Sequence, residues 1–327
     1  DRHYPAMREW MGYVERYMKD GLLTRWPDTP YRDWFLGDWL APHGVDTGSE
    51  ASVSLVNNCF VSDCYARMAQ MARLTGHDDE AAAFEARREA LNRTIHARFY
   101  DPATQTYATG SQLDMTYPML VGATPDSLRA GVEQRLFRLT HDVMKDHIGG
   151  GLVGVPVITR WAVRSHNPEF IYRMLKQRGY PGYLHMIDHG ATATWEYWSG
   201  ERSRVHNCYN GIGTWFYQAL GGLRTDSSHP GYEHVFIDPQ IPEGVEWCRI
   251  GKETPYGRID LGWEIADGEL RIDVTLPPGV TATAITPAGA CRGRLDGRRL
   301  APQSPGTKIA SGRHRLVFGL APQNERQ

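Results

Sequence analysis

Positions 31–42 combine aromatic, acidic and glycine residues, a set that could bind a ligand or act on it. Glycine and proline interrupt the run, so we expect a loop, and ligand-binding groups often gather on loops at helix ends. Tryptophan rings suit the apolar C–H faces of a sugar, and carboxylates accept hydrogen bonds from its hydroxyl groups. The candidates for ligand contact here are Asp33, Trp34, Asp38 and Trp39. The alternative is that the tryptophans anchor the loop in the core and Asp38 caps a turn.

A second candidate is Glu196, which stands among Trp195, Tyr197 and Trp198. A glutamate surrounded by aromatic rings can serve as a general acid or a general base. His206 follows ten residues later and could donate a hydrogen bond to a substrate hydroxyl or carboxylate. The alternative is that Glu196 begins a helix and keeps its carboxylate in water.

Two carboxylates on separate loops are the groups that glycoside hydrolysis uses. One protonates the leaving oxygen, and the other activates water or attacks the sugar carbon. Asp38 and Glu196 are the leading pair in this chain, with Asp33 as a further candidate. This chemistry requires no cofactor.

Other motifs are weaker. Residues 149–154 match a dinucleotide-binding fingerprint, but no βαβ unit surrounds them and Pro156 follows closely. His185, Asp188 and His189 have a spacing that could bind a metal on a helix. Neighbouring glycines and a proline favour a loop with a structural or substrate-lining role. We therefore predict no metal site.

The elements that must position these residues are helical up to about residue 222. Apolar residues at three- and four-residue spacing, with capping residues and glycine stops, predict paired helices. The predicted helices cover residues 4–20, 54–74, 79–99, 125–139, 168–178 and 211–220. Helical hairpins in succession can form a bundle, a solenoid or a toroid. No signature recurs at a fixed period, which disfavours the solenoid.

After about residue 225 the pattern changes to short, often alternating apolar runs separated by turn residues. The predicted strands are residues 235–237, 245–250, 258–263, 270–276, 281–285 and 314–318. Their spacing is typical of a β-sandwich. We therefore expect a helical domain over residues 1–225 and an all-β domain over residues 226–327.

Composition excludes several classes of function. The 327 residues carry 36 Lys and Arg against 38 Asp and Glu, so the formal charge of −2 gives no strong field to attract nucleic acid or an anionic membrane. No apolar stretch approaches the roughly 20 residues that cross a bilayer. The five cysteines are too sparse for a disulfide framework and leave the compartment open.

The ordered set of motifs resembles the bacterial α-L-rhamnosidase family over roughly residues 5–285. The matching pieces are Gly37-Asp38-Trp39-Leu40-Ala41-Pro42, residues 149–154 before Pro156, Tyr180-Pro181-Gly182-Tyr183 with Met186-Ile187, Gly190-Ala191-Thr192, Trp195-Glu196-Tyr197-Trp198, His206, Trp215-Phe216-Tyr217 and Thr254-Pro255-Tyr256-Gly257. The resemblance implies an (α/α)6 toroid followed by a β-sandwich. It also implies hydrolysis of terminal α-L-rhamnosides with inversion, by one acid and one base.

The resemblance also implies roles for the candidate residues. Glu196 corresponds to the general base that activates the attacking water. The other matching positions lie at the sugar pocket, and they are Asp38, Trp39, Trp195, Trp198 and His206. The expected partner is therefore a carbohydrate, and the sequence predicts no oligomeric state.

One family motif is missing. The general acid lies in an Arg-Asp-Glu-Arg type motif upstream of the Gly-Asp-Trp-Leu loop, and Arg32-Asp33-Trp34 does not match it. There are also fewer helical hairpins than the six that the family fold implies. We therefore expect the C-terminal portion of a longer enzyme, with its acid upstream and with weak or no activity in isolation.

The stretch Asn207-Cys208-Tyr209-Asn210 also departs from the family and leaves the identity of the sugar open. Two alternatives to a rhamnosidase follow. One is a helical-toroid glycosidase of other sugar specificity, and the other is a non-catalytic carbohydrate-binding fragment.

Overall fold

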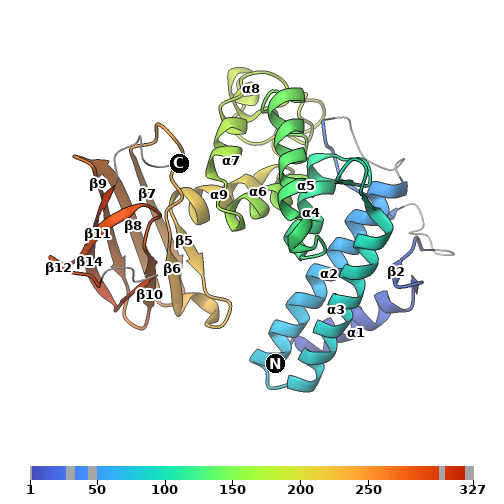
Figure 1. The fold of residues 1–327 in the computed structure, drawn as a ribbon, viewed down its shortest axis with the longest axis horizontal. Coiled ribbons are helices and arrows are strands. Elements are labelled where there is room, and N and C mark those ends of the chain that lie inside the picture. Colours follow the sequence, from blue (N-terminus) through green and yellow to red (C-terminus); the bar gives the residue numbers. More distant parts are fainter. Residues whose placement is uncertain (1, 27–33, 43–49, 302–305, 321–327) are drawn as a thin grey trace. The chain divides into compact units, whose positions relative to one another are not determined.

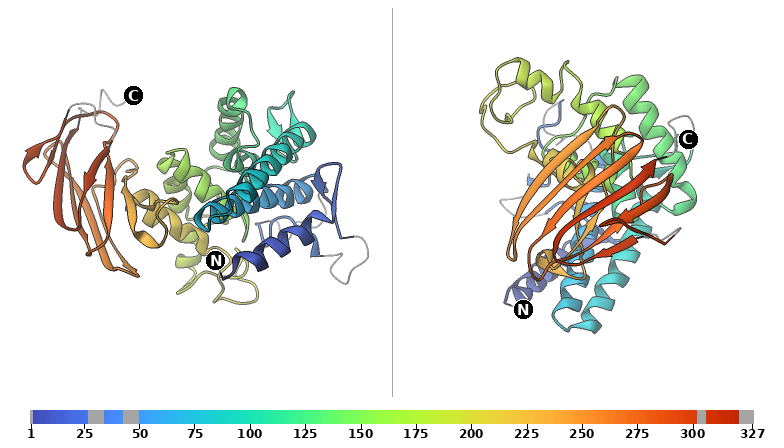
Figure 2. Two further views of the ribbon diagram at one scale, coloured as in Figure 1. Left: turned by 90° about the horizontal axis from the view of Figure 1, so that it is seen from below. Right: turned by 90° about the vertical axis from the view of Figure 1, so that its left-hand side faces the viewer.

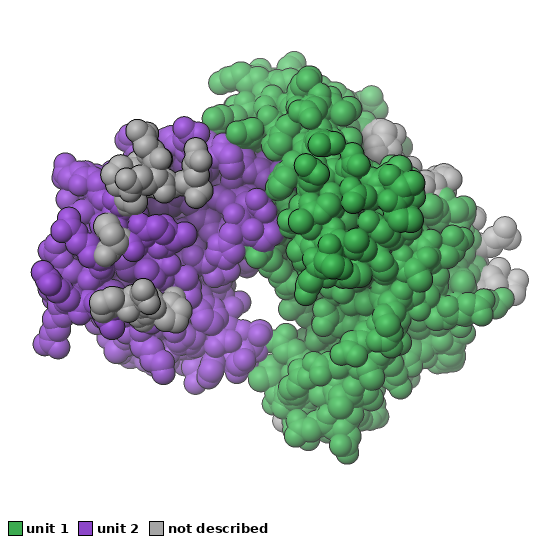
Figure 3. Space-filling model, viewed as in Figure 1, with its two compact units in different colours: residues 1–164, 173–212 green, residues 165–172, 213–327 purple. Residues whose placement is uncertain are grey.

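The computed structural model describes residues 2–26, 34–42, 50–301 and 306–320, and the chain forms two compact units, coloured separately in Figure 3. Unit 1 comprises residues 1–164 and 173–212, and unit 2 comprises residues 165–172 and 213–327. Unit 1 is helical, and unit 2 is dominated by β-sheet (Figure 1). The predicted fold class, a helical domain followed by an all-β domain, is confirmed.

The helices of unit 1 are α1 (Tyr4–Glu15), α2 (Glu50–Leu74), α3 (Asp78–Phe99), α4 (Gln112–Val121), α5 (Asp126–Arg138), α6 (Gly154–Arg164) and α8 (Tyr183–Asp188). Helix α7 (Pro168–Leu175) crosses the boundary between the units. Two short antiparallel ribbons pair β1 (Met18–Lys19) with β2 (Leu22–Leu23) and β3 (Tyr100–Asp101) with β4 (Thr106–Tyr107).

The predicted hairpin of α2 and α3 is confirmed, and the two helices lie side by side in both views of Figure 2. The turn between them uses Gly76 with φ +78°, a left-handed conformation that suits glycine. Buried polar side chains fix the pairing: the Ser62 hydroxyl donates to Asn92 Oδ1 at 2.6 Å, and Asn92 Nδ2 donates to the Val121 carbonyl at the end of α4.

Helices α4 and α6 are not predicted by the sequence pattern. All ten residues of α4 are buried, so no polar face exists to create a helical period. Helix α6 starts inside the glycine run that resembled a nucleotide-binding loop. The predicted helix over residues 211–220 is a succession of a 3₁₀ turn (Asn210–Ile212), α9 (Gly213–Trp215) and a π-helical turn (Phe216–Leu220).

A partly buried ion pair joins α2 to α6. Arg160 Nη1 and Nη2 lie 3.0 and 3.2 Å from the two carboxylate oxygens of Asp63. Burial raises the pKa of Asp63, but the hydrogen bonds and charge of Arg160 outweigh burial and hold this pKa below its usual 3.8. The ionised carboxylate therefore stabilises the folded state.

We expect Asp63→Asn to lower the free energy of unfolding by about 1.5–3 kcal/mol near neutral pH, because a charged hydrogen-bond pair is lost. The folded pKa of Asp63 lies below the unfolded one, so this stabilisation is present above pH 3.8 and is lost as the pH falls through the lowered folded value. Urea unfolding should therefore separate wild type from variant at pH 5, and the gap should shrink below pH 3.8. The control is Asp126→Asn, because the Asp126 side chain is fully exposed. A gap that widened on acidification would contradict the prediction.

Unit 2 contains two sheets. The six-stranded sheet has the order β12–β11–β14–β9–β8–β7, and the four-stranded sheet has the order β13–β10–β6–β5. The first comprises β7 (Trp247–Thr254), β8 (Gly257–Ala266), β9 (Glu269–Leu276), β11 (Ala290–Leu295), β12 (Arg298–Arg299) and β14 (Gly312–Leu320). The second comprises β5 (Leu223–Thr225), β6 (His234–Ile237), β10 (Thr281–Ile285) and β13 (Gly306–Ile309).

Apolar side chains from both sheets form one core, as a sandwich requires. Strand β9 shows the alternation: Ile272 and Val274 point into this core, whereas Arg271 and Asp273 belong to the opposite face. All neighbouring strands are antiparallel except β6 and β10, which are parallel. Among the described residues of the chain, no helix has the length and apolar character needed to cross a bilayer.

Candidate functional site

The loop of residues 34–42 is fixed to the start of α6 by Asp38. The Asp38 side chain is buried, its Oδ2 accepts the Gly151 N–H at 2.6 Å, and its Oδ1 accepts the N–H groups of Val153 and Gly154 at 3.0 and 2.9 Å. Burial raises the pKa of Asp38, and the backbone N–H donors oppose that shift. The carboxylate thus satisfies amide groups at a helix N-terminus, where the helix dipole also favours an anion.

The glycine run at residues 149–154 lets this loop approach the helix backbone. The Leu152 N–H donates to the Trp39 carbonyl at 2.7 Å. A Cβ atom on Gly151 would lie 2.1 Å from the Trp39 oxygen and 2.5 Å from the Ala41 nitrogen, so only glycine fits. The run allows the backbone of the loop to pack directly against the backbone of the helix, and among the residues that the structure describes no βαβ unit surrounds it.

Gly151→Ala is therefore expected to lower the free energy of unfolding by about 1–3 kcal/mol, since the added methyl group must push two backbone segments apart. Chemical unfolding followed by far-UV circular dichroism measures the loss. The matched control is Gly12→Ala within α1, where a Cβ atom meets nothing within 4 Å, so this change should be neutral or stabilising. Equal stability of Gly151→Ala and wild type would contradict the close approach.

Glu196 and His206 lie on the two arms of a hairpin-shaped loop, residues 194–206, called here the 194–206 loop. The His206 N–H donates to the Thr194 carbonyl, and the Glu196 N–H donates to the Ser203 carbonyl, both at 2.8 Å. Glu196 is half-buried, and its Oε2 accepts the Ser203 N–H at 3.3 Å. The alternative that Glu196 begins a helix is wrong, because this segment contains no helix.

Two aromatic side chains anchor the 194–206 loop to the rest of the site. The Tyr209 hydroxyl lies 2.8 Å from the Leu40 carbonyl oxygen and 3.1 Å from that of Glu196. The Trp198 indole N–H donates to the Gly150 carbonyl at 3.0 Å, and its ring stacks on Tyr209 with centroids 3.9 Å apart. The 34–42 loop, the start of α6 and the 194–206 loop therefore meet at one place in unit 1.

The resemblance places Trp195 and Trp198 at the sugar pocket, but both residues are buried. They are 2% and 1% exposed, so they offer almost no surface to a ligand. Trp34 and Trp39 offer accessible aromatic surface instead: Trp34 is 65% exposed, Trp39 is half-buried, and the rings stack at 6.4 Å between centroids. Asp33, the remaining candidate of this run, lies outside the described residues.

Both candidate carboxylates act electrostatically on the Cys208 thiol. Burial raises the pKa of Cys208 to about 11, and the negative charges of Glu196 and then Asp38 add to the shift. His206 Nδ1 accepts the Cys208 N–H at 3.2 Å, so a neutral His206 ring carries its proton on Nε2 and can donate from there. Cys208 and Tyr209 are not among the site residues predicted from the sequence, although their stretch differs from the family pattern.

Polar groups of the histidine cluster at residues 185–189 bond to neighbouring protein groups. His185 lies on the short helix α8, where the sequence analysis favoured a loop. His189 Nδ1 bonds the His185 carbonyl, and Asp188 pairs with Arg178 at 2.6 Å. Among the described residues, no group of three or more His, Cys, Asp or Glu side chains is arranged to hold a metal ion.

Comparison with known proteins gives two family matches. Residues 1–220 match the family model described as the bacterial alpha-L-rhamnosidase 6 hairpin glycosidase domain, and residues 222–298 match the bacterial alpha-L-rhamnosidase C-terminal domain. The chain is 24% identical over 303 residues to an alpha-L-rhamnosidase of Alteromonas sp. (strain LOR), with 87% of this chain and 32% of the relative covered. An alpha-L-rhamnosidase of Streptomyces avermitilis is 25% identical over 297 residues, with 87% and 27% covered.

Solved structures share the fold. The Streptomyces avermitilis alpha-L-rhamnosidase complexed with L-rhamnose superposes with a TM-score of 0.81 at 22% identity, over 96% of this chain and 30% of that one. The alpha-L-rhamnosidase from Dictyoglumus thermophilum gives 0.85 at 17% identity, over 97% and 37%. This chain spans about a third of the length of the curated relatives that it matches.

Proposed function

Because the chain belongs to the bacterial α-L-rhamnosidase family, we propose that it forms part of a glycoside hydrolase that releases terminal α-L-rhamnosyl residues from glycosides. The observation that carries the proposal is the convergence of three segments: the 34–42 loop, the start of α6 and the 194–206 loop. Their convergence puts Glu196, His206 and the Trp34–Trp39 stack in one region of unit 1. Such a set offers a carboxylate, an N–H donor and a stacking surface for a sugar.

Glu196 is the general base in this proposal. Its Oε2 receives one long hydrogen bond from the Ser203 N–H at 3.3 Å, so lone pairs of the carboxylate remain for a water molecule. In an inverting reaction that water attacks the anomeric carbon from the face opposite to the leaving oxygen, while Glu196 takes its proton. His206 Nε2–H binds a sugar hydroxyl, and the Trp34–Trp39 stack supports an apolar sugar face.

Asp38 is a positioning residue rather than the second catalytic carboxyl in this proposal. Both of its oxygens already accept backbone N–H groups, and proton transfer to a leaving group would break those bonds. The general acid of the reaction comes from a residue outside these 327, since the chain contains no Arg-Asp-Glu-Arg motif. The activity accordingly belongs to the full-length gene product.

Hydrolysis of p-nitrophenyl α-L-rhamnoside, compared with other p-nitrophenyl glycosides, tests the proposal on that full-length product. Preferential release of p-nitrophenol from the rhamnoside, with β-L-rhamnose as the first anomer seen by NMR, supports an inverting rhamnosidase. Turnover of a different sugar instead indicates a glycosidase of other specificity. Binding of rhamnose without any turnover indicates a carbohydrate-binding protein.

A further inference from the structure

The face of the six-stranded sheet that points away from the core of unit 2 is hollowed. A cavity of about 860 Å³ lies over β7, β8, β9 and β14, and it is called here the outer-sheet hollow. This volume falls in the range of roughly 300–1,000 Å³ that is usual for ligand sites. All of its lining residues belong to unit 2, whereas Glu196 and its neighbours belong to unit 1.

Strand register explains the hollow. One cross-strand row contains Trp247, Glu264 and Arg271, and the next contains Arg249, Gly262 and Asp273, which continues to Arg315 on β14. Gly262 has no side chain, and a Cβ atom there would lie 3.2 Å from Arg249 Cγ. The aliphatic part of the Arg249 side chain therefore lies over Gly262. Because glycine has no side chain, the outer-sheet hollow is deeper at this position.

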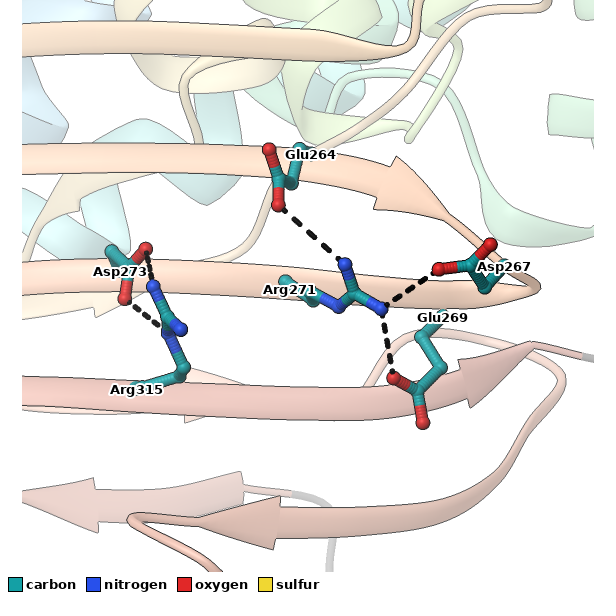
Figure 4. Close-up of polar contacts among 6 residues, drawn as sticks. All are labelled: Glu264, Asp267, Glu269, Arg271, Asp273 and Arg315. Carbon is teal, nitrogen blue, oxygen red and sulfur yellow. Dashed lines mark hydrogen bonds and ion pairs between the residues drawn. The ribbon is translucent and has the colours of Figure 1, made fainter.

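Ion pairs hold the polar groups of this face in place (Figure 4). Arg315 binds Asp273 through two hydrogen bonds of 2.7 Å each. Arg271 Nη2 lies 3.2 Å from Asp267 and 3.5 Å from Glu269, and Arg271 Nη1 lies 3.8 Å from Glu264. Planar guanidinium and carboxylate groups fixed in this way present donors and acceptors side by side.

The lining carries no excess of either charge. Four basic residues, Arg249, Arg271, Arg313 and Arg315, stand against four acidic residues, Glu246, Asp260, Glu264 and Asp273. Within the described residues Arg249 and Arg313 have no ion pair, so their N–H groups are available to hydroxyl oxygens. A balanced lining disfavours a strongly charged ligand and suits a neutral one with many hydroxyl groups.

Trp247 supplies the apolar part of the site. It begins the edge strand β7, and its side chain is 66% exposed, although a tryptophan gains much from burial. We propose that the outer-sheet hollow binds a neutral saccharide chain, with Trp247 stacked on a sugar ring and the arginine–carboxylate pairs bound to its hydroxyl groups. The hollow is larger than one monosaccharide needs, so the ligand is an oligosaccharide or a polysaccharide.

Affinity electrophoresis of the full chain in gels containing rhamnan, a neutral polymer of rhamnose, tests the proposal. The choice of rhamnan rests on the proposed function, and Glu196→Gln in every sample prevents turnover of the probe. Trp247→Ala should weaken rhamnan binding about tenfold or more, whereas Trp247→Phe, which keeps an aromatic face, should retain most of it. Trp10→Ala is the matched control, because Trp10 is 48% exposed on α1 in unit 1.

Salt dependence and a charged polysaccharide distinguish binding of a neutral saccharide from electrostatic binding. Binding to rhamnan should change little between 50 and 500 mM NaCl, and polygalacturonate should bind more weakly. Unchanged rhamnan binding in Trp247→Ala, or a preference for polygalacturonate that salt abolishes, would overturn the proposal. Hydrolysis of p-nitrophenyl α-L-rhamnoside is measured separately without the Glu196 change, so loss of the proposed function and loss of this saccharide site give different results. Equal melting temperatures of the variants show that folding is intact.

Discussion

Glu196→Gln is expected to lower kcat on p-nitrophenyl α-L-rhamnoside by about 10²–10⁴-fold in the full-length product, with KM nearly unchanged. Glutamine has the shape of glutamate but cannot accept the proton of the attacking water, and general-base catalysis contributes a factor of this size. Steady-state release of p-nitrophenol measures both constants. An effect on kcat rather than on KM identifies a group that acts in the transition state.

The matched control is Glu201→Gln. Glu201 lies at the exposed end of the same loop, so the variant makes the same chemical change without touching the proposed base. Its rate should stay within about twofold of wild type. The backbone N–H and carbonyl of residue 196 bond to Ser203 and Tyr209, so the Gln variant retains the loop conformation. A near-normal rate in Glu196→Gln would remove this residue from the role of base.

Asp38→Ala is expected to have the largest effect on stability, a loss of about 3–5 kcal/mol. The change leaves the N–H groups of Gly151, Val153 and Gly154 without their acceptor in a buried place, and each such group costs about 1–3 kcal/mol. Urea unfolding followed at 222 nm reports the helical unit. Rhamnosidase activity should fall together with stability, because the 34–42 loop loses its attachment to α6.

Two further variants test the cause of this loss. Asp38→Asn keeps one acceptor oxygen and should lose less stability than Asp38→Ala, although its amide group meets other donors. Asp188→Ala removes a carboxylate that pairs with the largely exposed Arg178, and it should cost about 1 kcal/mol or less. If Asp38→Ala and Asp188→Ala were equally stable, the attachment of the loop through Asp38 would be refuted.

Local patterns in the sequence predicted much of the fold. The helices α2 and α3 and the strands β8 and β9 each have one buried and one exposed face, and this pattern is visible without coordinates. Helix α4 could not be found in the same way, because it has no exposed face. Burial on every side removes the periodic signal on which such a prediction depends.

Pairing in space was harder to predict than residue type. The sequence identified Asp38 and Glu196 as the carboxylates of interest, and the charges of both act on the Cys208 thiol. It could not show that Asp38 bonds to Gly151, which lies 113 residues away. It could not show either that Trp195 and Trp198 are buried, because a tryptophan beside a glutamate has the same letters whether it supports a loop or lines a pocket.

The anchors of the 194–206 loop bear on laboratory evolution of sugar preference. Tyr209 and Trp198 bond to carbonyl oxygens of Leu40, Glu196 and Gly150, and every amino acid supplies such an oxygen. Changing an exposed side chain of this loop, other than Glu196, therefore removes no acceptor from the scaffold. Changes to the outward side chains of this loop can therefore alter sugar preference without breaking the bonds that anchor the loop. A mutant library restricted to these side chains should keep a high proportion of folded members.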